Sequence, residues 1–352
     1  MRFEKPDYDY PGPPLSTSRS IRVVLLQPAA HLEDEVRALV EIASLDECSP
    51  GGEIMPYQAL SYAWGEPPGT HAIFLNDSPQ PVHSNLFVAL RRLRPRNRVR
   101  RLWVDALCIN QQDPAERASQ VAQMADTFHR ASQVLIWVGE DSAACDGGAT
   151  FAFFAGCVTL YTLYSDKLEK ADRGEHSPDL LKAFLSRAWF TRRWIVQELS
   201  NSKHATLVCG EGQVPWRAFS RTIAVLLNVR NAADVEQRMS NKGPSIARAP
   251  QLIVLRQDRV GRDTLDHLEN FSMFECTDAS DLVYSLPSVD SLRASPPMVV
   301  PDHSLQAPQA YSALATRAVE QCMVLKLLSV HSQSTRCDSP ARLDQLPAFL
   351  DA

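Results

Sequence analysis

The fold of this chain is decided by residues 102–139, which read LWVDALCINQQDPAERASQVAQMADTFHRASQVLIWVG. The stretch begins within a continuous apolar run, RLWVDALCIN at 101–110, which contains a single acid and is typical of a strand buried on both faces of a parallel sheet. It ends with a second apolar run, VLIWVG at 134–139. We therefore expect two buried strands joined by a helical connection.

The connection starts with the helix signal Asp113-Pro114-Ala115-Glu116. Asp113 is a good capping residue, Pro114 suits the first turn, and Glu116 completes a reciprocal capping box. The following helix turns its apolar side chains inward: Val121, Met124, Ala125 and Phe128. This order of strand, helix and strand favours an α/β fold.

Upstream segments extend the same alternation. IRVVLLQPA, starting at Ile21, and YQALSYAWG at 57–65 are apolar runs that end at Pro or Gly and predict strands. AIFLND predicts a further short strand. The next segment, SNLFVALRRLR, predicts a helix that Ser84 caps and that carries an apolar face of Leu86, Leu90 and Leu93.

Downstream, helical patterns alternate with one more strand. TFAFFAGCVTLYTLY, KAFLSRAWF and RRWIVQELS are helix-like, ATLVCG at 205–210 predicts a strand, and the chain beyond Trp216 is mainly helical. The predicted fold class is α/β, with a mostly parallel sheet flanked by helices and a helical C-terminal extension.

Composition divides the chain further. Residues 1–19 are rich in Pro, Ser and charge, which predicts a flexible leader. We expect the main domain at residues 20–230 and the helical extension at residues 231–352. A Pro- and Ser-rich loop is expected near 285–304 within that extension.

Several kinds of partner are disfavoured by charge and cysteine spacing. The net charge of -5 offers no field for nucleic acid, and the one basic run, Arg91 to Arg101, has the alternative explanation of a solvated helix end. The eight cysteines include no C-x-x-C pair, so no metal is expected. No apolar run approaches the ~18 residues of a membrane span, so we expect no membrane association and a cytoplasmic location.

Four blocks in order resemble the fungal heterokaryon incompatibility (HET) domain family. They are YQALSYAWG, then residues 102–139, then RAWFTRRWIVQEL, and last TDASDLVYSLPSV. The resemblance covers roughly residues 20–230 for the domain proper, with weaker family-like sequence to about 320. It implies a role in fungal self/non-self recognition and cell-death signalling, exerted through homotypic association with other proteins.

A more distant resemblance links two blocks to TIR signalling domains. YQALSYAWGEP is similar to the TIR opening strand and its loop, and TRRWIVQEL is similar to the TIR helix that bears Trp and, four residues later, Glu. The resemblance implies a TIR-like, flavodoxin-like core. It also implies NAD as a candidate substrate, no resident cofactor, and Glu198 as the catalytic residue.

Glu198 has both a chemical and a structural explanation. Cleavage of a nicotinamide–ribose bond passes through an oxocarbenium-like state that a carboxylate stabilises. Trp194 lies four residues earlier, on the same helix face, and is a candidate binding residue. Alternatively, Glu198 pairs with Arg192, Arg193 or Arg187 and only fastens the helix.

Asp105 and Cys108 are further candidates for catalysis. Asp105 is expected at the end of a buried strand, where open α/β sheets bind ligands, but a carboxylate there can also serve as a cap. Cys108 is a nucleophile if its pKa is lowered, and otherwise a buried packing residue.

Four more residues are candidates for contact with a ligand. Asn110 and its neighbour Gln111 precede a capped helix and can contact a phosphate at its N-terminus or simply satisfy the loop backbone. Trp64 and Gly65 follow a predicted strand, where Gly permits close approach to a ligand and Trp64 can equally belong to the core.

Two other classes of function remain open at this point. One is a biosynthetic enzyme of the same fold that uses Cys108 or Asp105 on a small molecule. The other is a non-catalytic interaction module.

Overall fold

The computed structural model describes residues 10–46, 56–65, 71–140, 183–226, 248, 251–252, 264–285, 299, 305–320 and 323. The chain divides into two compact units. The first unit comprises Met1–Ala183, Arg187–Trp189 and Ser202–Thr222. The second unit comprises Phe184–Ser186, Phe190–Asn201 and Ile223–Ala352.

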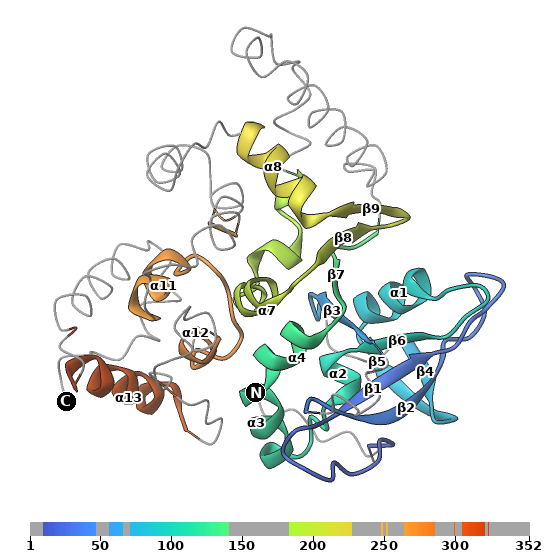
Figure 1. Cartoon of the computed structure of the whole chain (residues 1–352), viewed down its shortest axis with the longest axis horizontal. Helices are drawn as coiled ribbons and strands as arrows, with labels where there is room; N and C mark the ends of the chain where they lie inside the picture. The colour runs from blue at the N-terminus through green and yellow to red at the C-terminus, as the bar shows by residue number, and fades with distance from the viewer. Residues whose placement is uncertain are drawn as a thin grey trace, which may run out of the picture. The chain divides into compact units, whose positions relative to one another are not determined.

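The first unit is built on a nine-stranded sheet, counted over the described residues (Figure 1). The strand order is β5-β4-β2-β1-β6-β3-β7-β8-β9. The strands are β1 Ser20–Leu26, β2 Arg37–Ser44, β3 Gln58–Tyr62, β4 His71–Leu75, β5 Ser78–Val82, β6 Arg100–Trp103, β7 Gln133–Trp137, β8 Ala205–Cys209 and β9 Gly212–Pro215.

The sheet is mixed, so the prediction of a mostly parallel sheet is wrong. The inner strands β6, β3, β7 and β8 are parallel neighbours. Strand β1 runs antiparallel to both β2 and β6, and the pairs β4–β5 and β8–β9 are antiparallel hairpins. The α/β class is confirmed, with parallel pairing concentrated in the inner strands.

Two short turns explain the antiparallel outer strands. Asn76 and Asp77, between β4 and β5, both have positive φ, 49° and 62°, as a type I′ hairpin turn requires. Gly210, between β8 and β9, has a φ of 52°. A connection this short can join only antiparallel strands, because a parallel crossover needs a dozen or more residues.

Helices cover both faces of the inner strands. Phe128 of the last helix before β7 packs edge-on against Trp103 of β6, with ring centroids 5.4 Å apart. On the opposite face, the indole of Trp137 in β7 donates a hydrogen bond to Asn85 in the first helix. The helices of the first unit are α1 Ser84–Leu93, α2 Asp105–Cys108, α3 Pro114–Ala122 and α4 Met124–Arg130, and α8 Trp216–Leu226 follows β9.

The local helix predictions are largely confirmed. The apolar face of α1 is buried as expected at Leu86, Leu90 and Leu93. Ser84, however, is the first residue of the helix and not its cap, because His83 occupies the N-cap position without a side-chain cap bond. The single helix expected after Asp113 is interrupted at Gln123, which separates α3 from α4.

The second unit is helical wherever the structure describes a long enough segment. The block RRWIVQELS forms a helix as predicted, and Arg192, just before it, makes a parallel bridge with Glu275. The segment TFAFFAGCVTLYTLY lies outside the described residues. The elements are α7 Ile195–Asn201, α11 Thr264–Asn270, α12 Asp281–Tyr284 and α13 Ala307–Glu320, with a 3-10 turn, Ala188–Thr191, at the boundary of the units.

The N-terminal segment makes specific contacts where it is described. Of the predicted flexible leader, residues 10–19 are described. Asn76 donates a hydrogen bond to the Pro11 carbonyl, and the Arg22 Nε donates to the Pro13 carbonyl at 2.7 Å. Of the predicted loop near 285–304, only Ser285 and Val299 are described.

The carboxyl ends of β7 and β8 are held by a glycine and an arginine. The Gly139 carbonyl accepts from Gly210 N, and Arg187 donates to the carbonyls of Val138 and Glu140. Gly139 has a φ of +111°, and a Cβ added there would lie 3.1 Å from the Arg187 guanidinium. Both backbone and space therefore require glycine at this position.

We predict that Gly139→Ala destabilises the protein by about 1–3 kcal/mol, because an L-residue is strained at positive φ and the arginine must shift. Urea unfolding measures the effect. Gly65→Ala is the comparison, since its φ is +77° but the added Cβ would meet only the Asn85 Cβ at 3.7 Å. Equal losses for the two variants would contradict a contribution from the Arg187 contact.

Candidate functional site

The candidate residues of the first unit lie just beyond the carboxyl ends of two neighbouring parallel strands. Trp64 and Gly65 follow β3, and Asp105 follows β6. Among the parallel inner strands, β6 lies on one side of β3, and β7, the next strand along the chain after β6, lies on the other side of β3. Such a reversal of strand order is where open α/β sheets bind ligands.

A direct contact brings two of these candidates together. The indole Nε1 of Trp64 donates to the Asp105 Oδ2 at 2.8 Å. The other carboxylate oxygen of Asp105 accepts from Ala106 N at 2.7 Å. Asp105 was expected at the end of a strand, but β6 ends at Trp103 and Asp105 instead begins the one-turn helix α2. Its carboxylate thus accepts from the backbone of the first turn of α2 and fixes the Trp64 ring, while the N-cap position belongs to Val104.

Cys108 lies at the other end of the same turn and is fully buried. Its sulfur accepts from Val104 N at 3.2 Å. Burial raises the pKa of the Cys108 thiol to about 12, so the thiol is protonated at neutral pH. This environment matches the packing explanation and disfavours a thiolate nucleophile.

Asn110 and Gln111 satisfy polar groups of their own loop. The Asn110 side chain accepts from Gln112 N at 3.1 Å, and Gln111 donates to the Asp105 carbonyl at 3.0 Å. These contacts match the turn-forming explanation given from the sequence. They also place both residues beside the α2 turn.

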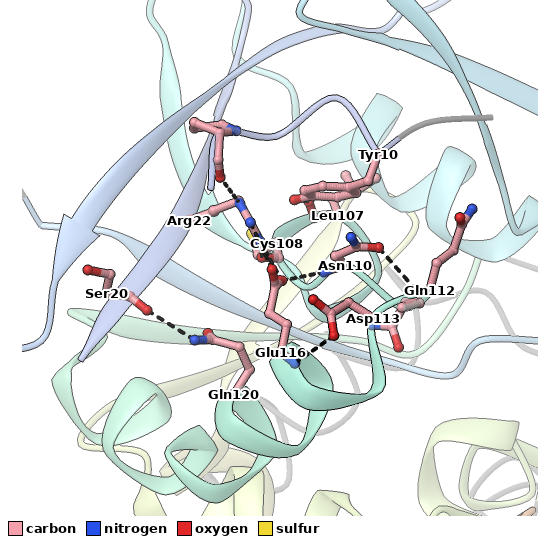
Figure 2. A network of polar contacts seen from close by, with 12 residues as sticks. Tyr10, Ser20, Arg22, Leu107, Cys108, Asn110, Gln112, Asp113, Glu116 and Gln120 are labelled. Carbon is pink, nitrogen blue, oxygen red and sulfur yellow. Dashed lines mark hydrogen bonds and ion pairs between the residues drawn. The ribbon is translucent and has the colours of Figure 1, made fainter. Parts of the chain in front are cut away.

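The position of this loop depends on a buried ion pair (Figure 2). The two guanidinium nitrogens of Arg22 meet the two carboxylate oxygens of Glu116 at 2.5 and 3.0 Å. Figure 2 shows Glu116 also accepting from Asn110 N, at 2.7 Å, while Arg22 donates to the Cys108 carbonyl at 3.1 Å. The pair therefore holds both the end of α2 and the loop that follows it.

The contacts of the Glu116 side chain differ from those of the predicted capping box. Asp113 caps α3 as expected, since its side chain accepts from Ala115 N and Glu116 N. The Glu116 carboxylate does not return to the cap residue but is turned to Arg22 and Asn110 instead. The buried arginine competes successfully for it, because a charged donor forms the stronger hydrogen bond.

Tyr10 and Arg22 were missed by sequence reasoning. Arg22 is 2% exposed, and Tyr10 covers it with its ring 4.6 Å from the guanidinium carbon. The Tyr10 hydroxyl donates to the Leu107 carbonyl at 2.7 Å. Arg22 alone gave a usable signal, because one arginine inside the apolar strand SIRVVLL must have a buried partner.

The remaining candidates, Trp194 and Glu198, belong to the second unit. Trp194 immediately precedes α7, and its carbonyl accepts from Glu198 N at 3.1 Å, so the two residues are one turn apart as expected. Glu198 is 3% exposed. Its carboxylate lies 3.6 Å from the Arg192 Nη1, which is one of the three pairings expected from the sequence.

The start of α7 is fastened to the block TDASDLVYS. The Trp194 indole donates to the Asp281 Oδ2 at 2.9 Å. Arg193, which is 1% exposed, donates to the carbonyls of Phe271 and Leu282 and to the Ser285 hydroxyl. Two of the blocks that carry the family resemblance therefore bind each other within the second unit.

Three arginines of the basic run Arg91–Arg101 form ion pairs with acids of the first unit. Arg91 pairs with Glu33, Arg92 with Glu140 and Glu211, and Arg101 with Glu41. A shallow depression of about 270 Å³ adjoins its first two residues. It is lined by Leu32, Glu33, Val88, Arg91, Arg92 and Glu140.

The described residues contain no group of three or more His, Cys, Asp or Glu side chains arranged to hold a metal ion. None of their helices is both long and apolar enough to cross a membrane.

We predict that Glu116→Gln lowers the free energy of unfolding by about 3–5 kcal/mol, because it leaves the buried Arg22 charge uncompensated. Urea unfolding followed by circular dichroism measures the change. Glu35→Gln is the matched control: Glu35 pairs with Arg37 at the surface, where its side chain is 61% exposed, so we expect a loss below about 1 kcal/mol. Similar losses in the two variants would contradict the special role of the buried pair.

We predict that Cys108 resists alkylation in the folded protein. A pKa raised from the ordinary 9.0 to about 12 lowers the thiolate fraction at neutral pH by about a thousandfold, and burial blocks access as well. Mass spectrometry of iodoacetamide-treated protein gives the rate for each cysteine, with half-buried Cys276 as the internal reference. Rapid native-state labelling of Cys108 near pH 7 would contradict the structure.

Comparisons with known proteins bear on the same region. Residues 57–198 match the family model described as Heterokaryon incompatibility protein (HET). The chain is also 30% identical over 236 residues to "Heterokaryon incompatibility protein 6, OR allele" of Neurospora crassa. That alignment covers 55% of this chain and 33% of the relative, so the matching part spans about a third of the relative's length. No solved structure matches. Over residues 57–198 the chain is thus similar to proteins of the HET family.

Proposed function

We propose that the chain acts in fungal self/non-self recognition and signals cell death by hydrolysing NAD. The recognition role is supported by the match of residues 57–198 to the HET family and by the name of the Neurospora relative. In this proposal the parallel inner strands are a TIR-like, flavodoxin-like core. The chain associates with other copies of its domain and works in the cytoplasm, where NAD is available.

The observation that carries the enzymatic part is the contact between Trp64 and Asp105. It joins the carboxyl ends of two parallel neighbours at the reversal of strand order, where α/β sheets bind nucleotides. Gly65, with a φ of +77°, follows Trp64 and leaves the backbone open to close approach.

Glu198 is the proposed catalytic residue. In NAD hydrolysis the bond from ribose C1′ to the pyridinium nitrogen breaks, the bonding pair stays on nicotinamide, and water adds to C1′ with release of a proton. Positive charge develops on the ribose, so an ionised carboxylate stabilises the transition state or holds the ribose hydroxyls. One acid suffices, because nicotinamide leaves as a neutral base.

Arg192 has a defined part in this proposal. Burying the Glu198 carboxylate at 3% exposure is costly without a compensating charge, and Arg192 supplies one at 3.6 Å. The same contact also favours a second candidate function, a non-catalytic interaction module in which the pair only fastens α7. A reaction that uses the Cys108 thiolate is disfavoured by the burial of that side chain.

We predict that Glu198→Gln lowers nicotinamide release from NAD by about a hundredfold or more, since a preorganised group that meets developing charge contributes this much. NAD binding should remain. Release is followed by chromatography, at high protein concentration and with the chain fused to an oligomerising tag, because association is part of the proposal.

Glu320→Gln, at an exposed acid of α13, is the control and should release nicotinamide like the wild type. Equal release from the Glu198→Gln variant would remove Glu198 from the mechanism. No release from the oligomerised wild-type chain would favour the interaction module.

A further inference from the structure

An aromatic pair stands at the carboxyl end of β3. Trp64 is 37% exposed, which makes it one of the most exposed large apolar side chains among the described residues. Its ring lies 5.4 Å from the ring of His83, with the planes tilted by 44°. His83 is half-buried and occupies the N-cap position of α1, so the two rings come from different elements.

Hydrogen bonds hold the Trp64 ring and the start of the helix that carries His83. Asp105 fixes the indole edge of Trp64 at 2.8 Å. Asn85 fixes the start of α1, because it donates to the Ala63 carbonyl at 2.6 Å and accepts from the buried Trp137 at 2.9 Å. The Trp64 ring is therefore preorganised, and a ligand that stacks on it need not order this side chain first.

Asp105 still has room to accept hydrogen bonds. An ionised carboxylate offers about four acceptor positions. Trp64 and Ala106 each use one of them, and Asp105 is only half-buried. A hydroxyl donor that lies beside the Trp64 ring can therefore reach the same carboxylate that holds the ring.

We propose that Trp64, His83 and Asp105 form a nucleoside-binding surface, in which a flat base stacks on the Trp64 ring and a hydroxyl of its ribose donates to Asp105. The inference rests on the proposed function in so far as the nucleoside belongs to NAD. It adds His83 to the site and gives Trp64 and Asp105 distinct roles.

The test is a binding measurement that does not depend on turnover. Isothermal titration of the full chain uses AMP and nicotinamide mononucleotide, which carry the two bases of NAD, and ribose 5-phosphate, which carries none. Trp64→Leu should weaken binding of the preferred mononucleotide by about 5- to 150-fold, the range for loss of base–aromatic stacking. Binding of ribose 5-phosphate should stay unchanged.

Three further variants separate the contributions. Trp64→Phe keeps a ring and loses the NH, so its loss should be smaller than that of Trp64→Leu. His83→Ala should weaken the same mononucleotide, whereas His31→Ala, at an exposed histidine elsewhere in the first unit, should not. Asp105→Asn should weaken the ribonucleotide more than its 2′-deoxy form. Unfolding midpoints identify any variant that does not fold.

The outcomes distinguish this surface from the proposed hydrolysis. Nucleotide binding that depends on Trp64 and His83 supports the surface, even if the chain releases no nicotinamide. The proposal is overturned if folded Trp64→Leu and His83→Ala bind both mononucleotides as tightly as the wild type does. It is also overturned if the wild type binds neither mononucleotide at millimolar concentration. Nicotinamide release with an unchanged KM in Trp64→Leu would overturn the surface and leave the hydrolysis intact.

Discussion

The arrangement of the first unit depends on the buried pair of Arg22 and Glu116. Burying a charge is costly unless it is paired and hydrogen-bonded, and here the guanidinium meets both oxygens of one carboxylate and two backbone carbonyls. The pair joins β1, which lies between β2 and β6 and runs antiparallel to both, to α3, the first helix after the α2 turn. The loop between Asp105 and Asp113 has its position because both of its flanks are tied to this pair.

The sequence predicts the inner part of the fold better than the outer part. The strands at 58–62 and 133–137 lie in mainly apolar segments that can be recognised without knowing their partners, and the strand at 100–103 ends in such a segment. Two-residue turns make the pairs β4–β5 and β8–β9 antiparallel, and Asn76-Asp77 was an available turn signal that the strand prediction AIFLND absorbed. The antiparallel pairing of β1 with β6 gave no such signal, because it joins segments far apart in the chain.

The candidate site was predicted as a set of residues but not as a geometry. Trp64 and Asp105 were each singled out for following a strand, and the structure brings them to 2.8 Å. The one-turn helix α2 could not be predicted, because DALC is as apolar as a strand and the turn is fixed by Arg22, a residue 86 positions away from Cys108. His83 was not predicted as a site residue, because the N-cap position of α1, which His83 occupies, was predicted for Ser84.

The setting of Glu198 shows the same dependence on distant residues within the second unit. Trp194 and Arg193, at the entry to α7, are anchored by Asp281 and Leu282, which lie 87 and 89 positions further along the chain. Because both anchors act on the residues just before the helix, they fix its first turn, in which Glu198 lies. The downstream block TDASDLVYS therefore has a physical reason to accompany RRWIVQELS. It supplies the partners of the Trp194 indole and the Arg193 guanidinium, and these partners fix the first turn of α7. The position of the Glu198 carboxylate beside Arg192 thus depends on this block as well.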